Sequence, residues 1–349
     1  MNVSLFSTFT SIPASSVRGP DSTGCFVNLY GKPIWVRDIT WDWDWEVPDR
    51  AVVQTYGTPL GDAIRCGLKY QNQPMTNGRI PVCLLAKATN WRAHTPPFSV
   101  AGDVVHSTFT WTFGAPLWLP TNVPLTIEIG HTNDFVVQSP AGAQTVDVTL
   151  RGVIDDSGLE PEYIDVPYAT AFLGAVQSSV VAATTGLAPM VTEQTAQTDL
   201  FNPFSVPLNI DRMQYEISVS SHGTDVPGGA ANANFAPTDA TSAQDQTSLL
   251  AASQNYGLDR RYVQMKLTSS RGRNLVKDFL PIGAIIPSTT RSWETKSILN
   301  PAAYYVATLH EEMPLFTDRG ALPFQMRVGL SLVGSRRLKT AEAFDTYWR

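Results

Sequence analysis

Strict alternation of aromatic and acidic residues constrains the fold of this chain most strongly. In the run 41–45, three tryptophans alternate with Asp42 and Asp44, so an extended strand would place the two residue types on opposite faces. The run 106–113 repeats the pattern with aromatic residues opposite threonines. One face of each strand is therefore expected to be buried and the other wet, which is typical of antiparallel sheets.

Short strand patterns recur along the chain, and helical patterns are minor. Only two stretches, 61–68 and 242–253, predict short helices. The 24 glycines and 25 prolines are scattered between apolar runs, as turns are between strands. The sequence therefore predicts an all-β fold with short helical insertions. Further strand patterns lie at 34–40, 125–129, 146–151, 262–267 and 325–332.

Charged residues make up only 16% of the chain, against roughly 25% of an average soluble domain. With 349 residues and 43% hydrophobic residues, the chain is long and apolar enough for two domains with their own cores. The net charge is −6, with 10 basic and 16 acidic residues in 1–174 and 15 of each in the remainder. Nucleic-acid binding needs clustered lysine and arginine, so we expect no direct sequence-specific contact with nucleic acid. The small clusters at 271–273 and 336–339 are expected to be turn and strand-end residues.

Three cysteines, Cys25, Cys66 and Cys83, show no metal-binding spacing and are an odd number. This favours a reducing compartment over a zinc site or a disulfide framework. No positively charged segment precedes an apolar run at the start of the chain, so no secretory signal is expected. The most apolar stretch, 169–186, is interrupted by polar residues and falls short of the ~18 apolar residues that a membrane span requires. Its conformation, helix or strand, stays open.

An approximate internal repeat divides the chain near its middle. The segments 33–43 and 207–217 share a proline followed by a strand pattern, and they match at an offset of 174 in the numbering. A second pair, 116–130 and 314–329, matches at offsets of 198 and 199. The difference requires roughly 25 extra residues in the second half, for which the loop-like segment 223–241 and the helix after it offer a place. We interpret the matches as a duplication, although alternation bounded by proline is common in β-proteins.

The repeat predicts two tandem domains. Each half has enough short strands for the eight of a jelly roll, a sandwich of two antiparallel sheets. Segments without periodic structure at the chain ends usually gain order from neighbours, so an arm is expected to serve assembly rather than folding. The expected organisation is an N-terminal arm 1–30, a first jelly roll 31–165, a connector 166–200, a second jelly roll 201–338 with the long loop 223–241, and a C-terminal tail 339–349.

In its length, its tandem strand-rich halves, the inserted loop and the low charge, the chain resembles the double jelly-roll major capsid proteins of icosahedral viruses with an internal membrane, including tailless bacteriophages. The resemblance covers 31–338 and is architectural, without a diagnostic motif. It implies a homotrimer that forms a pseudo-hexagonal capsomer and tiles the shell of a virion. Other capsid proteins, such as penton or minor proteins, and an internal viral membrane are the implied partners, with synthesis in the host cytoplasm.

Sequence motifs of catalysis and cofactor binding are absent. The chain contains no GxSxG, phosphate loop, GxGxxG or HExxH motif, and its five histidines lack paired metal-ligand spacing. Calcium held between loops by Asp134, Asp155 or Asp156 is conceivable but has no support in the sequence. We therefore predict no catalytic residue, no cofactor site, no metal site and no enzymatic activity.

The alternating run also permits a different chemistry. Asp42 and Asp44 could bind a cation or act as the acid–base pair of a carbohydrate-cleaving sandwich. Trp41, Trp43 and Trp45 could stack on sugar rings. We favour the simpler interpretation, in which the tryptophans are core residues and the aspartates belong to the wet face of an amphipathic strand.

Three functions therefore compete. A structural shell protein is favoured, because a surface with few charges desolvates cheaply and permanent interfaces are depleted of lysine, glutamate and aspartate. The alternatives are a carbohydrate-binding or carbohydrate-active β-sandwich protein and another virion component, such as a spike or tail protein.

Overall fold

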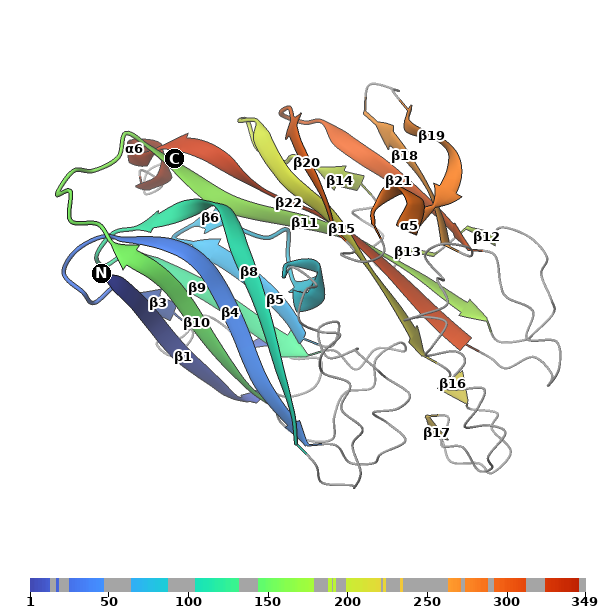
Figure 1. Cartoon of the computed structure of the whole chain (residues 1–349), viewed down its shortest axis with the longest axis horizontal. Coiled ribbons are helices and arrows are strands. Elements are labelled where there is room, and N and C mark those ends of the chain that lie inside the picture. The colour runs from blue at the N-terminus through green and yellow to red at the C-terminus, as the bar shows by residue number, and fades with distance from the viewer. Residues whose placement is uncertain are drawn as a thin grey trace.

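Two β-sandwiches lie beside each other in the computed structural model of the chain (Figure 1). All strand pairs within the sheets are antiparallel, which confirms the all-β prediction. Among the described residues, no helix has both the length and the apolar character needed to cross a membrane. The structure describes residues 1–12, 17–18, 25–46, 64–86, 104–131, 144–178, 188–189, 191–192, 199–220, 222–223, 233–234, 263–270, 274–287, 292–311 and 324–344.

The first sandwich has the strand order of a jelly roll. One sheet has the order β1-β10-β4-β8, and the other places β9 between β5 and the pair β2 and β3, with β6 and β7 on the far side of β5. If β2 with β3, and β6 with β7, are each counted as one interrupted strand, this roll has eight strands. Numbered from one to eight in chain order, they are arranged 1-8-3-6 in one sheet and 2-7-4-5 in the other, which is the double Greek key of a jelly roll. The strands are β1 (Asn2–Ile12), β2 (Val17–Arg18), β3 (Cys25–Val27), β4 (Ile34–Glu46), β5 (Ile64–Tyr70), β6 (Gln73–Pro74), β7 (Ile80–Pro81), β8 (Val104–Leu119), β9 (Pro124–His131) and β10 (Gln144–Ile154).

The second sandwich repeats this order. One sheet runs β13-β11-β22-β15-β20. In the other sheet β21 pairs with β12, β14 and β18, and β18 also pairs with β19. In chain order these are again strands 1-8-3-6 and 2-7-4-5, so the chain is a double jelly roll. The strands are β11 (Tyr163–Ser178), β12 (Ala188–Pro189), β13 (Val191–Thr192), β14 (Asp199–Phe201), β15 (Leu208–Ser220), β18 (Val263–Ser269), β19 (Asn274–Pro281), β20 (Ser292–Leu299), β21 (Tyr304–Glu311) and β22 (Phe324–Lys339), with β16 (His222–Gly223) and β17 (Ala233–Asn234) forming a separate pair.

Helical turns are few in the described part of the chain. They are η1 (Val82–Leu84), α5 (Ile282–Ile285) and α6 (Thr340–Phe344). The expected helix over 61–68 is wrong, because residues 64–70 form β5, which pairs with β9 along its whole length. The pattern was too short to distinguish a helical turn from a buried strand, and the pairing with β9 decides it.

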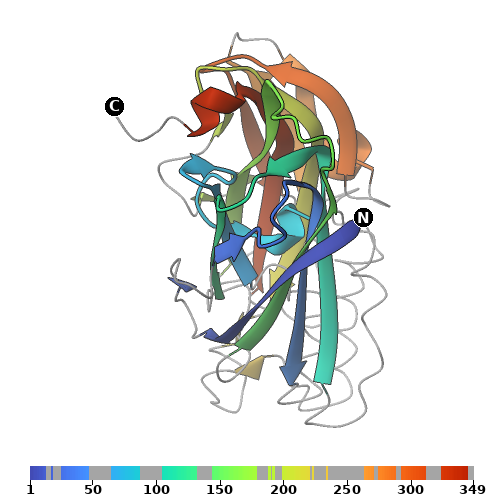
Figure 2. The same ribbon diagram turned by 90° about the vertical axis from the view of Figure 1, so that its left-hand side faces the viewer.

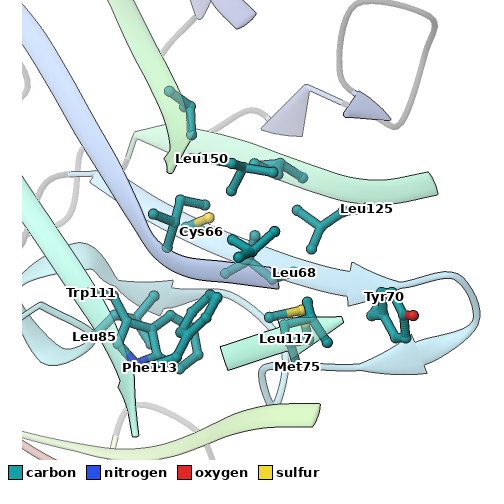
Figure 3. Close-up of a cluster of buried hydrophobic side chains, with 14 of the residues drawn as sticks. Cys66, Leu68, Tyr70, Met75, Leu85, Trp111, Phe113, Leu117, Leu125 and Leu150 are labelled. Atoms are coloured by element: carbon teal, nitrogen blue, oxygen red, sulfur yellow. The ribbon is translucent and has the colours of Figure 1, made fainter. Parts of the chain in front are cut away.

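The period-two pattern of the sequence sorts side chains between core and surface as expected. Trp41 is fully buried, and the next strand supplies Trp111 and Phe113, whose rings meet edge to face at 5.1 Å between centroids. Figure 3 shows these two rings together with aliphatic side chains from both sheets of the first roll. A second cluster, which includes Met213 and Tyr215, fills the second roll.

The first matched segment pair of the sequence is structurally equivalent. The same offset of 174 relates the bounds of β3 to those of β14, and the bounds of β4 to those of β15. Between them, the turn of each roll is held by a buried asparagine, Asn28 or Asn202. Each donates from Nδ2 to two backbone carbonyls and accepts at Oδ1 from the N–H two positions ahead, at 2.7–3.0 Å. The partners are Lys32, Leu119 and Tyr30 for Asn28, and Val206, Leu299 and Phe204 for Asn202.

A β-bulge recurs at equivalent positions of the two rolls. The register of the third strand shifts by one position at Arg37 in β4 and at Asp211 in β15, which are equivalent under the same offset. Facing each bulge is a glycine, Gly152 or Gly334. A Cβ on Gly152 would lie 2.5 Å from a backbone carbonyl oxygen of the third strand, and a Cβ on Gly334 would lie 1.9 Å from the equivalent oxygen. The bulge pushes this backbone against the eighth strand, so only glycine fits there.

The second matched pair of the sequence is wrong in detail. The segment around 124–130 lies in β9, the seventh strand, whereas the described part of 314–329 lies in β22, the eighth. The seventh strand of the second roll is β21, which lies well before the matched segment. The separation in sequence between the fourth strands of the two rolls, β5 and β18, is larger than that between the third strands, β4 and β15. The added residues of the second roll therefore fall between β15 and β18. Proline-bounded alternation marks many strands, and only the pairing shows which strand is which.

The ends of the rolls differ from the expected boundaries. Residues 2–12 of the expected arm form β1, which pairs with β10 and buries Val3 in the first core. The expected connector 166–200 begins inside β11, a strand that pairs with β22 over its full length. The expected tail 339–349 begins with the last residue of β22 and continues into α6. A strand can complete a sheet with few apolar residues, because its partner supplies the hydrogen bonds. Most of the expected loop 223–241 and the helix 242–253 lie outside the described residues.

We expect replacement of either turn asparagine by alanine to destabilise the chain. Asn28→Ala and Asn202→Ala each leave buried backbone groups without hydrogen-bond partners, which should cost roughly 1–3 kcal/mol of unfolding free energy. Urea unfolding measures the loss. The exposed Asn300→Ala is the matched control and should leave the midpoint unchanged. Equal midpoints for all three variants would contradict the role of the buried asparagines.

Candidate functional site: the interface between the two jelly rolls

Of the two aspartates in the alternating run, Asp42 has a described side chain. Asp42 is half-buried on the outer face of β4 and accepts a hydrogen bond from Thr108 Oγ1 at 2.5 Å. Trp41 points into the core, so its ring cannot stack on a ligand. Asp44 lies in β4, but its side chain, like those of Trp43 and Trp45, falls outside the described part. Among the described residues, no group of three or more histidine, cysteine or acidic side chains is placed to hold a metal.

Two of the loop aspartates considered as calcium ligands form contacts within the protein. Asp156 forms an ion pair with Lys32 at 2.5 Å, and this hydrogen bond lowers the pKa of Asp156. Asp155 accepts from the N–H of Ser157 at 3.0 Å, and its hydrogen bonds to Ser157 lower the pKa of its carboxyl. Asp134 lies outside the described residues. These carboxylates fix the segment 155–162, the linker between the two rolls.

The main polar cluster of the described residues lies between the rolls. Strand β15 turns Met213 and Tyr215 into the second core, so by alternation Arg212, Gln214 and Glu216 face outward. All three are nevertheless buried. Arg212 and Gln214 are covered by the segment 82–86 of the first roll, to which both donate hydrogen bonds.

The segment 82–86 presents a set of backbone carbonyls to the second roll. The N–H groups of Leu85 and Ala86 both donate to Val82 O, which closes the short helical turn η1. A single turn leaves its last carbonyls without partners inside the helix. They are therefore available to side chains of the second roll.

Side chains of β15 and β22 donate to each of these carbonyls. Gln214 Nε2 donates to Cys83 O at 2.9 Å and to Ala86 O at 3.1 Å. Ser331 Oγ donates to Leu84 O at 2.8 Å, and Arg212 Nη2 donates to Leu85 O. The guanidinium of Arg212 is oriented by a hydrogen bond from Nε to Gln214 Oε1 at 2.9 Å. Four successive carbonyls of the first roll are thus bound by three side chains of the second.

Burial shifts the pKa values of the charged groups in this cluster. Burial lowers the pKa of Arg212 to about 10, with the carboxylates of Asp211 and Glu294 acting in the opposite direction. The guanidinium therefore stays protonated at neutral pH. Burial raises the pKa of Asp211, and Arg212 opposes this. The Asp211 carboxylate also lies where a Cβ on Gly114 of β8 would stand, so the two rolls approach closely here.

A second buried arginine joins the rolls near the end of β22. Arg336 is fully buried, with its guanidinium carbon 3.5 Å from the ring centroid of Phe204, and its Nη2 donates to Gln73 Oε1 of the first roll at 2.9 Å. Burial lowers the pKa of Arg336 to about 10. The cluster 336–339 was expected to consist of strand-end residues, and Arg336 does lie at the end of β22. Its guanidinium faces an aromatic ring and is not accessible to a phosphate.

Helix α6 and strand β11 complete the contact. The ring of Phe344 in α6 lies 5.9 Å from Tyr70 and 6.2 Å from Trp118 of the first roll, measured between centroids. Ala169 of β11 exchanges backbone hydrogen bonds with Met75 and Asn77, each at 2.9 Å. Residues of β11 belong to both cores. The interface therefore combines apolar packing, backbone pairing and buried charge, and it joins the rolls into one unit.

The sequence alone did not mark these interface residues. Arg212 and Gln214 alternate with apolar residues and have the pattern of a wet strand face. One signal was available for the turns: extending the first matched pair toward the N-terminus aligns Asn28 with Asn202. For the interface itself no sequence signal distinguishes a buried polar face from an exposed one.

Comparisons with known proteins concern the fold. No protein-family model matches the chain, and no curated protein matches its sequence. PBCV-1 VP54, in a crystal structure fitted into a cryo-EM reconstruction of the virophage Sputnik, is 10% identical, covering 97% of this chain and 96% of that one, with a TM-score of 0.46. The mavirus major capsid protein is 8% identical, covering 96% and 87%, with a TM-score of 0.31. A peptide-N(4)-(N-acetyl-β-D-glucosaminyl) asparagine amidase is 11% identical, covering 97% and 99%, with a TM-score of 0.29. All three likenesses extend over nearly the whole chain at low identity.

Removal of a buried interface arginine should destabilise the chain. Arg212→Ala and Arg336→Ala each delete a charged hydrogen-bond donor and leave an acceptor of the first roll unpaired, a loss of roughly 1.5–3 kcal/mol in unfolding free energy. Lys339→Ala, an exposed position on the same strand, is the control and should stay within about 0.5 kcal/mol of the parent chain. Urea unfolding gives these differences. An Arg336→Ala variant as stable as Lys339→Ala would refute the assignment.

The aromatic contact of α6 should also contribute to stability. Phe344→Ala removes two aromatic ring pairs, each worth about 0.5–1.5 kcal/mol. We expect a lower thermal midpoint and faster proteolysis, since α6 would no longer be anchored to the first roll. Glu342→Ala, an exposed change in the same helix, should behave like the parent chain. Unchanged melting and proteolysis of Phe344→Ala would show that α6 does not clamp the rolls.

Proposed function

We propose that this chain is the major capsid subunit of an icosahedral virus, a structural protein that trimerises and tiles a shell. The observation that carries the proposal is the rigid pairing of two jelly rolls with the same strand order. Three such subunits around a threefold axis provide six similar lobes, and a six-lobed unit packs in a hexagonal lattice. The buried contact around Arg212 and Gln214 supports this role, because lobes that moved independently could not hold a lattice.

The surface of the chain supports assembly. Only 16% of residues are charged, and permanent interfaces are depleted of charged groups at their centres. Large apolar side chains are exposed on both rolls, and such side chains gain free energy when a second protein covers them. The exposed ones are Met1, Leu29, Tyr30, Leu159, Tyr163, Leu275, Leu280, Trp293 and Ile298.

The lattice geometry and the charge point to further partners. A hexagonal lattice closes into a shell only with pentagonal units, so we propose a penton protein and minor capsid proteins as partners. With a net charge of −6 and no basic half, the chain is not suited to neutralise a genome. An internal viral membrane is the proposed layer between shell and genome.

The proposal places the protein in the virion after synthesis in the host cytoplasm. Cys25, Cys66 and Cys83 form no disulfide with one another, which suits a reducing compartment. The proposal assigns the chain no catalytic role.

The oligomeric state of the purified chain tests the proposal. We expect sedimentation at three times the 38.1 kDa of one chain, and six-lobed particles in negative-stain electron microscopy. The expected interface exceeds ~2,000 Å², as in permanent complexes. A protein that stays monomeric at high concentration, without particles in the images, would exclude the capsid role.

A further inference from the structure

A carboxylate lies at the seam between the rolls, by which we mean residues 82–86 and Gly114 of the first roll together with 211–214 of the second. Asp211 occupies the bulge of β15, and its carboxyl group lies within 2.7 Å of the position that a Cβ on Gly114 would take. Gly114 belongs to β8, the edge strand of its sheet, whose described side chains at 108–119 include no titratable group. The Asp211 side chain is half-buried, and in the described part of the chain no hydrogen bond or ion pair reaches its oxygens.

The guanidinium next to this carboxylate is bonded elsewhere. Arg212 Nη2 donates to Leu85 O, and Arg212 Nε donates to Gln214 Oε1 at 2.9 Å. The first of these bonds directs the guanidinium to the turn η1. In Figure 2 the first roll faces the viewer, and η1 lies as a cyan turn in front of the strands of the second roll. The turn contributes one titratable side chain, the thiol of Cys83. Arg212 therefore attracts Asp211 through space, without donating a hydrogen bond to it.

Two further carboxylates of the second roll act on Asp211. Glu294 of β20 lies opposite Arg212, and Asp165 of β11 lies opposite Arg337 of β22. Both repel the Asp211 carboxylate as like charges. Opposite the bulge itself, β22 carries no charged residue. The ionised form of Asp211 therefore faces two like charges, while the arginine that attracts it is bonded to the other roll.

These surroundings favour the protonated form of the carboxyl group. Burial raises the pKa of Asp211, Arg212 opposes this, and the two carboxylates add to it. Because the pKa is higher in the folded chain than in the unfolded chain, the folded chain binds this proton more tightly. The stability that the proton contributes is fully present below the ordinary pKa of an aspartate, and it is lost as the pH rises through the raised pKa. At neutral pH the seam therefore holds a charge that its packing opposes.

The bulge does not require a carboxylate at this position. In the first roll the equivalent residue is Arg37, which is exposed. The acidic residue beside it, Asp38, accepts a hydrogen bond from Arg151 Nε at 2.6 Å, so its charge is compensated. The order of acid and base is thus reversed between the two bulges, and only the second roll places its acid against the other roll. The carboxylate of Asp211 is therefore a feature of the seam and not of the bulge.

From this geometry we propose that Asp211 makes the seam sensitive to pH: its protonated form lets the rolls close on each other, and its ionised form admits water and loosens the contact around η1. A carboxylate without a hydrogen-bond donor is stabilised by hydration, and water reaches this one when β15 and β8 separate. Arg212 and Gln214, which hold the carbonyls of the first roll, lie within three residues of Asp211 on the same strand. The device belongs to the single chain and goes beyond the proposed shell role, because it makes the rigidity of the paired rolls depend on the acidity of the surroundings.

A neutral side chain of the same shape tests the role of the charge. Asp211→Asn should raise the urea midpoint of unfolding above that of the parent chain at about pH 7.5, and the difference should shrink steadily as the pH falls to about 4, where the parent carboxyl group gains its proton. Asp278→Asn, the same change at an exposed position of β19, is the control and should follow the parent chain at every pH. A midpoint that Asp211→Asn lowers equally at every pH would show that the carboxylate acts as the counter-ion of Arg212, and would overturn the inference.

A double-variant cycle with Gly114 tests whether the effect arises at the seam. Gly114→Ala places a methyl group where the Asp211 carboxyl group lies, so the carboxyl group has to turn out of the seam. In the Gly114→Ala chain, Asp211→Asn should therefore no longer change the pH dependence of the urea midpoint. A pH-dependent gain from Asp211→Asn as large in this chain as in the parent would place the effect outside the contact of β15 with β8 and contradict the inference.

The reactivity of Cys83 reports the opening of the seam directly. Its thiol is half-buried in η1, whose carbonyls bind the second roll, so loosening of the contact should expose it to iodoacetamide. At one fixed pH near neutrality, Asp211→Asn should slow the alkylation of Cys83 several-fold relative to the parent chain. Cys25, half-buried in β3, is the internal control and should react equally in both proteins. Mass spectrometry of the labelled peptides separates the two sites. Equal rates at Cys83 in variant and parent would reject the loosening of the seam, whatever the urea midpoints.

Discussion

The binding of four backbone carbonyls by buried side chains of the second roll is the interaction on which the arrangement of this chain depends. The carbonyls of residues 83–86 are available because the turn η1 is too short to satisfy them. Gln214, Ser331 and Arg212 bind them in the space between the rolls, where water is excluded and an unpaired group would be costly. Relative rotation of the rolls would break several of these bonds at once, so the two rolls form one unit.

The repeat explains how such a unit arises from two similar halves. The features retained in both rolls are those that backbone geometry demands, namely the turn asparagines Asn28 and Asn202 and the glycines Gly152 and Gly334 opposite the bulges. The features that differ lie on outer surfaces. Where the second roll carries Gln214, the first carries Thr40, and where the chain continues into α6 in one half, it continues into the linker in the other. Divergence of this kind lets the outer face of the second roll close a contact on the first.

Sequence patterns predicted the core of the fold well. Alternation placed Trp41 and Trp111 inside and Asp42 on the outer face, because a strand has two faces and only one meets the core. The same reasoning failed where an element has no strong pattern. The frequent serine and threonine of residues 2–12 predict an arm, yet pairing with β10 makes these residues a strand. Residues 64–68 gave the opposite error, since a run this short fits either a turn of helix or a strand until its partner is known.

By itself the sequence determined the all-β class, the presence of two equivalent halves and the low charge that suits a shell. These properties follow from side-chain periodicity and composition, which act within a few residues of chain. Only the tertiary structure decided which polar residues are buried, because Arg212 and Arg336 owe their burial to segments that lie far away in the chain. A polar strand face has the same pattern whether water or a neighbouring roll covers it, and the packing of one roll on the other resolves the difference.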